Sequence, residues 1–145
     1  GGVRVPMIAR WPGKISPGAV SDHVSAFWDV LPTLCEIAGA KTPRDTDGIS
    51  FAPTLLGNPE KQRAHDYLYW EFPSVGGKQA ARMGNWKGLR LNLFENQDAP
   101  VELYNLEHDI GEQNNVAPEN PEVVEKMKQI FKTARTESEL FKLFG

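Results

Sequence analysis

The stretch AARMGNWKGLRLNLF, residues 80–94, decides the fold of the second half of the chain. Two short apolar segments flank the pair Gly84-Asn85, and a pair of this kind favours the tight turn of a β-hairpin. In the second segment, three leucines alternate with polar residues from Leu89 onward, which is typical of a strand with one buried face. The stretch therefore predicts an antiparallel hairpin.

Two further segments have the same strand pattern. Residues 65–72 (HDYLYWEF) alternate, with Leu68, Trp70 and Phe72 on one face. Residues 101–106 (VELYNL) are predicted to form a further strand. Together with the hairpin, these segments predict about four antiparallel strands that bury one face of their sheet.

A helix is expected after the strands. Asn120 can cap its first turn, and Pro121 suits the first helical position. Its apolar residues recur at three- and four-residue spacing and form one stripe of Val123, Met127, Ile130 and Ala134. We expect this helix to cover the apolar face of the sheet. The fold class is therefore α+β, a small antiparallel sheet of about four strands with a C-terminal helix packed on it.

The first third of the chain has a different pattern. Residues 5–11 are mostly apolar and end in turn chemistry, which predicts a buried strand. A helical pattern follows, which we expect to become regular near Asp29 and to end at Gly39. Residues 40–65 are rich in turn signals, so we expect the boundary between two structural units in this region.

Composition excludes several classes of function. The chain has 145 residues, a net charge of −3 and 24% charged residues, without a basic block that would indicate a nucleic-acid partner. No apolar segment is long enough to span a membrane, and no leader-type pattern is visible. The single cysteine, Cys35, lies in the helical stretch, where we expect a buried and inert thiol.

No complete catalytic constellation is visible in the sequence. The histidines His23, His65 and His108 stand alone, and none has a second His or Cys at zinc-ligand spacing. Three carboxylates between Glu107 and Glu112 could offer oxygens to calcium, but they lack the ligand density of an EF-hand loop. A solvated turn is the preferred interpretation. We therefore predict no catalytic and no metal-binding residue in this chain.

A group of aromatic side chains in and before the predicted hairpin is the best candidate for a binding site in the sequence. With Arg82 and Lys87 nearby, they could form a rim for a sugar or an anionic group, because a guanidinium suits a sulfate or carboxylate. Aromatic residues in strands also form core contacts and cross-strand pairs, so this alternative stays open. The set consists of Tyr67, Tyr69, Trp70, Phe72 and Trp86.

Six segments match, in order, a pattern known from one enzyme family. They are GGVRVPMIARWPGKISPG, FWDVLPTLCEIAGA, DGISFAPTLLG, YLYWEF, AARMGNWKGLRLN and VELYNLEHDIGEQNNVA. In this order the chain, from Gly1 to about Arg135, resembles the C-terminal portion of the type I sulfatases. This family of arylsulfatases and glycosaminoglycan sulfatases belongs to the alkaline-phosphatase-like superfamily. The shared order and spacing make the resemblance specific.

The resemblance implies that the parent protein is a sulfuric ester hydrolase that uses formylglycine and calcium. The family forms formylglycine from a cysteine in a Cys-x-Pro-Ser-Arg motif, whereas Cys35 is followed by Glu36-Ile37-Ala38-Gly39 and is therefore not that residue. The family's calcium carboxylates and catalytic His and Lys lie upstream of its glycine pair. We therefore expect the chain to be a part of a longer sulfatase and to be inactive by itself.

The resemblance also assigns the two parts of the chain. Residues 1–57 would be the tail of the catalytic α/β domain, with its last strand and helix, and residues 58–145 would be the C-terminal subdomain. This subdomain would help to form the wall of the substrate pocket. We expect the substrate-binding residues to be Glu71, Arg82, Trp86 and Lys87.

The expected partners follow from the same reading. They are the missing N-terminal catalytic domain and, through the parent, a sulfated small molecule or glycan, with neither nucleic acid nor membrane. Residues 5–11, separated from their sheet, would expose a strand edge that could pair two copies into a homodimer. A non-catalytic binding or interaction module that keeps part of the fold is the alternative. The residues leave localisation open, and only the resemblance suggests a periplasmic, secreted or lysosomal compartment.

Overall fold

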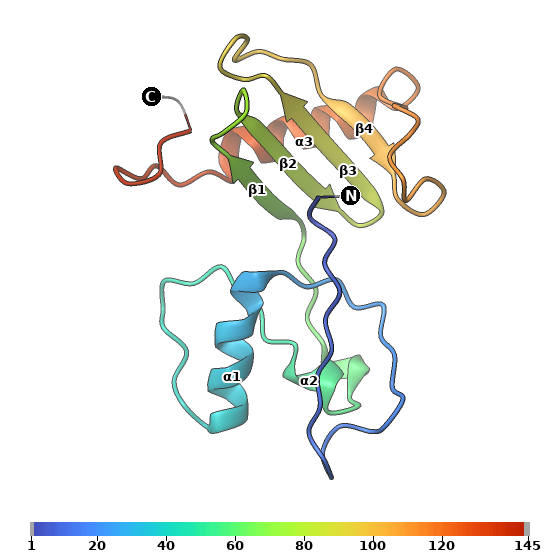
Figure 1. The fold of residues 1–145 in the computed structure, drawn as a ribbon, viewed down its shortest axis with the longest axis vertical. Coiled ribbons are helices and arrows are strands. Elements are labelled where there is room, and N and C mark those ends of the chain that lie inside the picture. Colours follow the sequence, from blue (N-terminus) through green and yellow to red (C-terminus); the bar gives the residue numbers. More distant parts are fainter. Residues whose placement is uncertain (1, 144–145) are drawn as a thin grey trace. The chain divides into compact units, whose positions relative to one another are not determined.

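The structure, a computed structural model, describes residues 2–143, which form two compact units (Figure 1). The first unit covers Gly2–His65, and the second unit begins at Asp66. The division falls after His65, at the end of the turn-rich region of residues 40–65, and the assignment of residues 1–57 and 58–145 to two domains of the parent stays a prediction. Each unit is described separately below.

The second unit is built on a four-stranded antiparallel sheet in which each strand pairs with the next along the chain. In the turn between the two central strands, Gly84 has a φ of 58°, which glycine tolerates without steric cost. The predicted hairpin and the four antiparallel strands are confirmed. The strands are β1 (Leu68–Phe72), β2 (Lys78–Met83), β3 (Trp86–Leu91) and β4 (Glu102–Asn105).

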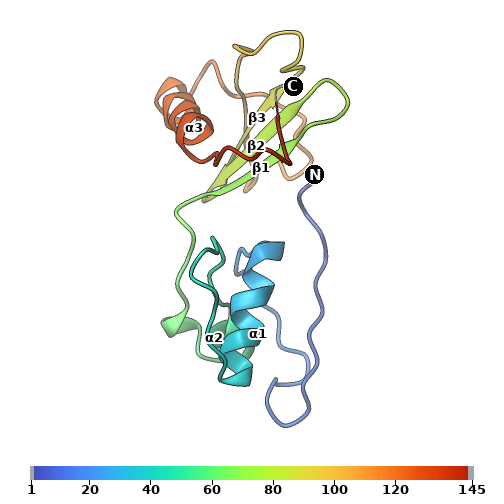
Figure 2. The same ribbon diagram turned by 90° about the vertical axis from the view of Figure 1, so that its left-hand side faces the viewer.

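Helix α3 (Pro121–Thr133) covers one face of this sheet, as predicted (Figure 2). Met127 lies so close to β3 that a Cβ on Gly88 would be 3.0 Å from its Cγ, so the glycine allows the close approach. Asn120 occupies the predicted N-cap position, but its side-chain amide donates to the carbonyl of Val116 instead. The buried core between helix and sheet comprises Ala81, Val101, Leu103, Val123, Met127, Ile130 and Phe131.

The first unit is formed by two short helices and their connecting loops. A 3-10 turn (Phe27–Asp29) leads into α1 (Val30–Ala38). The helix ends at Gly39, which adopts a left-handed backbone conformation. Helix α2 (Ala52–Leu55) and a second 3-10 turn (Pro59–Lys61) follow. The predicted start and end of α1 are therefore confirmed. None of the helices between residues 2 and 143 is long and apolar enough to span a membrane.

The strand predicted for residues 5–11 is not formed. The segment has no regular secondary structure, and its apolar side chains are exposed, with Ile8 at 96% and Val5 at 61%. A strand needs a neighbour for its backbone N–H and C=O groups, and the described part of the first unit contains no strand. The prediction of a buried strand was therefore wrong for this chain. The strand edge on which the expected homodimer rested is also not formed.

Candidate functional site

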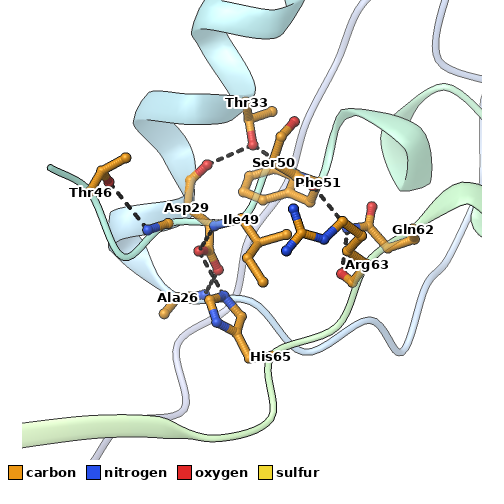
Figure 3. Close-up of polar contacts among 11 residues, drawn as sticks. Ala26, Asp29, Thr33, Thr46, Ile49, Ser50, Phe51, Gln62, Arg63 and His65 are labelled. Atoms are coloured by element: carbon orange, nitrogen blue, oxygen red, sulfur yellow. Dashed lines mark hydrogen bonds and ion pairs between the residues drawn. The ribbon is translucent and has the colours of Figure 1, made fainter. Parts of the chain in front are cut away.

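A buried carboxylate organises the first unit (Figure 3). Asp29, immediately before α1, is 0% exposed. Its Oδ2 accepts a hydrogen bond of 2.7 Å from the backbone N–H of Ala26. Its Oδ1 accepts one of 2.8 Å from the N–H of Ile49 and lies 2.8 Å from Nε2 of His65. One side chain thus joins the loop before α1, the turn before α2 and the last residue of the unit.

Two neighbouring residues complete this junction. The hydroxyl of Thr33 donates to the backbone carbonyl of Asp29 at 2.6 Å and accepts from the N–H of Phe51 at 2.9 Å. Gly48 lies against the preceding helical turn, where a Cβ would be 2.2 Å from the carbonyl oxygen of Trp28. The glycine of the DGIS segment is therefore required by space, because a larger residue would overlap the backbone.

The pairing of His65 with Asp29 corrects the prediction that each histidine stands alone. The two residues are 36 positions apart, and no local spacing signals such a contact. Burial lowers the pKa of His23 from its ordinary value, an effect that the Asp29 charge opposes and His65 reinforces. Because two backbone N–H groups also donate hydrogen bonds to the carboxylate, this cluster anchors loops of the first unit.

The register of the sheet places the four predicted substrate-binding residues on two opposite faces. Glu71 and Trp86 lie on the face that α3 covers. The carboxylate of Glu71 accepts a hydrogen bond from the hydroxyl of Tyr69 and pairs with Arg135 Nε at 2.9 Å. Burial, followed by the hydrogen bond to Glu71, raises the pKa of Tyr69. Trp86 packs against the buried core. Both residues therefore serve the contact between sheet and helix.

Arg82 and Lys87 are direct register partners on the opposite face. Arg82 is half-buried, and its Nε donates to the carbonyl of Gly84 at 3.0 Å. Lys87 is 3% exposed, and its Nζ lies 2.7 Å from both carboxylate oxygens of Glu112. Burial alone would raise the pKa of Glu112, but opposing interactions, led by the hydrogen bond from Lys87, hold it below its ordinary range. The structure thus brings two of the four residues together.

The aromatic set is divided in the same way. Tyr69 makes an edge contact with Phe131 of α3, with 6.3 Å between the ring centroids. Trp70 and Phe72 alternate with Tyr69 along β1 and so lie on the other face, where Phe72 is 54% exposed. Strand alternation therefore separates these side chains, and they do not form one continuous rim. The alternative of core contacts is correct for Tyr69 and Trp86.

The carboxylates of the loop after β4 have structural partners. Asp109 accepts hydrogen bonds of 2.8 Å from the backbone N–H groups of Gln113 and Asn114, which lower its pKa. Within residues 2–143, no group of three or more His, Cys, Asp or Glu side chains could hold a metal ion. Cys35 is a free thiol and is only half-buried, whereas the sequence analysis expected full burial.

Comparison with known proteins shows which family the chain resembles. The family described as N-sulphoglucosamine sulphohydrolase, C-terminal, matches residues 1–137. The chain is 31% identical to the Ulvan-active sulfatase of Formosa agariphila, over 96% of this chain and 34% of that protein. It is 35% identical to arylsulfatase A of Homo sapiens, over 90% of this chain and 30% of that protein. The chain spans between about a quarter and a third of the length of such relatives.

Solved structures show the same relationship. The structure of Ps i-CgsB matches with a TM-score of 0.71 and 27% identity, over 86% of this chain and 27% of that one. The structure of BT4656 in complex with its substrate D-glucosamine-2-N,6-O-disulfate matches with a TM-score of 0.67 and 25% identity. That match covers 86% of this chain and 26% of the other.

Proposed function

The chain belongs to the sulfatase family described as N-sulphoglucosamine sulphohydrolase, C-terminal, and on this premise we propose that the whole protein hydrolyses sulfate esters of sugars. The observation that carries the proposal is the family match over residues 1–137. Relatives with sulfatase names that align with most of the chain support the reaction class. The disulfated glucosamine bound by one related structure supports a sugar substrate.

We place the reaction chemistry outside this chain. The family resemblance implies formylglycine and calcium, but the residues described here fit neither group. Between residues 2 and 143 there is no group of three or more His, Cys, Asp or Glu side chains that could hold a metal, and Cys35 is followed by Glu36-Ile37-Ala38-Gly39, which does not match Cys-x-Pro-Ser-Arg. No step of sulfate ester hydrolysis is therefore assigned to a residue of this chain. In our proposal, the remainder of the polypeptide supplies both groups.

The contribution of this chain, in our proposal, is part of the substrate-pocket wall. Arg82 is the residue that we expect to face a substrate, because it lies on the sheet face opposite α3 and a guanidinium group suits a sulfate. Lys87 is the register partner of Arg82, but its ammonium group is already paired with the carboxylate of Glu112. Glu71 and Trp86 would support the wall from the helix-covered face.

The test compares the full-length protein with residues 1–145 alone, on a chromogenic aryl sulfate and on D-glucosamine-2-N,6-O-disulfate. We expect the full-length protein to release sulfate and the isolated chain to release none. Turnover by the isolated chain would place the catalytic groups within it and contradict the assignment. If the full-length protein releases no sulfate from either compound, the alternative of a non-catalytic interaction module is favoured.

A further inference from the structure

We propose that the segment after α3 is a strap that locks the loop between β3 and β4, and that opening of the strap frees this loop. The strap is defined as residues 134–143, and the loop as residues 92–101. Both belong to the second unit. The family match ends at residue 137, so most of the strap lies outside the region that the family relationship covers.

The far end of the strap is held by an apolar contact with the loop. Leu143 is 1% exposed and forms a small cluster with Leu93 and Ala99, separate from the core between α3 and the sheet. Both partners of Leu143 belong to the loop. A residue of the strap therefore completes the apolar cluster of the loop.

The near end of the strap is held by Arg135. Its Nε atom lies 2.9 Å from Oε1 of Glu71 on β1, and the two side chains of this pair are largely buried. The guanidinium also pairs with Glu137, and its Nη2 donates to the backbone carbonyl of Phe141 at 3.2 Å. Arg135 thus fastens the strap to the sheet and also fixes the path of the strap itself.

A chain of hydrogen bonds connects this ion pair to the loop. The carboxylate of Glu71 accepts from the hydroxyl of Tyr69, which accepts from Nε2 of Gln79 at 2.7 Å. Oε1 of Gln79 accepts from Nη1 of Arg90 at 3.0 Å. Arg90 donates in turn to the backbone carbonyls of residues 97 and 99 in the loop. The strap therefore reaches the loop twice, directly through Leu143 and indirectly through these side chains.

Few contacts hold the strap closed. Among its large apolar side chains that the structure describes, Leu143 is buried, whereas Leu140 and Phe141 are 87% and 73% exposed. A segment with few buried contacts opens locally at a lower free energy than the whole domain needs to unfold. We therefore expect the strap to open while α3 stays on the sheet, and the loop to lose part of its packing when this happens.

The first experiment measures hydrogen exchange in the full-length variant Leu143→Ala, with Leu140→Ala as the matched control in the same strap. Loss of the buried leucine favours the open strap, so we expect the amides of Leu93 and Ala99 to exchange about tenfold faster or more. The control should leave these rates at the wild-type value. Unchanged exchange in α3 checks that the variant folds. Equal loop exchange in the two variants would overturn the proposal.

A second variant tests the other end of the strap and does not depend on the first. Arg135→Gln removes the ion pair with Glu71, and the control Lys132→Gln makes the same charge change at an exposed position one turn earlier. We expect faster exchange of the loop amides in Arg135→Gln alone. If the two glutamine variants show the same loop exchange, the near end does not lock the loop and the proposal fails.

The double variant Leu143→Ala/Arg135→Gln shows whether the two ends act as one device. Both changes open the same strap, so we expect its loop amides to exchange more slowly than the product of the two single effects would give. An effect equal to that product would mean independent contacts and would contradict the strap. All these readouts are exchange rates, so they do not depend on whether the full-length protein hydrolyses sulfate esters.

Discussion

The Nε2 atom of His65 lies 2.8 Å from Oδ1 of Asp29, although 36 positions separate the two residues in sequence. The contact joins the residue before α1 to the last residue of the first unit. The same carboxylate holds the backbone N–H groups of Ala26 and Ile49. A single buried side chain therefore connects three segments of the first unit.

Removing this carboxylate should destabilise the first unit strongly. Asp29→Ala leaves two backbone N–H groups and His65 without their acceptor, so we expect a loss of about 3 kcal/mol in the free energy of unfolding. His65→Gln keeps a donor and should cost less. Hydrogen exchange of α1 in the full-length protein measures the change. The control is the exposed Asp45→Ala, expected within about 0.5 kcal/mol of the wild type, and similar losses in both variants would refute the anchoring role.

The lowered pKa of His23 predicts a pH dependence of stability. The unfolded chain binds a proton at this histidine near pH 6.5, whereas the folded chain does so only at lower pH, mainly because burial disfavours the charge. Stability from His23 is therefore present above pH 6.5 and is lost as the pH falls towards the folded pKa. We expect His23→Gln to reduce the pH dependence of the melting temperature below this value. The exposed His108→Gln is the control, and an unchanged profile in His23→Gln would exclude the effect.

The ion pair of Lys87 and Glu112 should contribute more than an exposed pair. Lys87→Met removes the two hydrogen bonds and the charge that Lys87 offers to the largely buried carboxylate of Glu112, which we expect to cost about 3 kcal/mol in the free energy of unfolding. Lys128→Met is the matched control, because its pair with Glu125 is exposed and should contribute at most about 1 kcal/mol. Urea denaturation compares the free energy of unfolding of the two variants. Equal losses would show that the buried ion pair contributes no more stability than the exposed one.

The pH profile gives a sharper readout of the same pair. In the wild type, the lowered pKa of Glu112 means that its stabilisation is present above its ordinary pKa of 4.5 and is lost as the pH falls through the folded pKa. In Lys87→Met, the hydrogen bond and the charge of Lys87 no longer lower the pKa of Glu112, whereas burial still raises it. We therefore expect the contribution of Glu112 to become smaller, so that the variant loses less stability in acid than the wild type.

The pocket-wall role predicts a defined kinetic effect of Arg82. In the full-length protein, Arg82→Ala should raise the KM for D-glucosamine-2-N,6-O-disulfate about tenfold, because a charge-assisted hydrogen bond to sulfate is lost. The exposed Arg63→Ala in the first unit is the control. A KM that is equal in the two variants would remove Arg82 from the pocket wall and leave it a role in the sheet alone.

Local patterns predicted most of the fold. Alternating leucines and the Gly84-Asn85 turn indicated the hairpin, and the spacing of apolar residues indicated α1 and α3, because these signals depend only on neighbouring residues. The prediction for residues 5–11 failed because an apolar, strand-like composition does not supply a partner strand. A partner strand comes from tertiary structure, which the local sequence pattern does not encode.

The candidate site was less predictable, for a physical reason. Proximity of Arg82, Trp86 and Lys87 in sequence suggested one cluster, but side chains alternate across a sheet, and the register sends Trp86 to α3 and the other two to the opposite face.

By itself, the sequence determined most of the secondary structure, the α+β class and the resemblance to sulfatases, because all three depend on residue order. Only the tertiary structure decided that Asp29 pairs with His65 and Lys87 with Glu112, because these contacts join residues that are distant in sequence and require burial to be favourable.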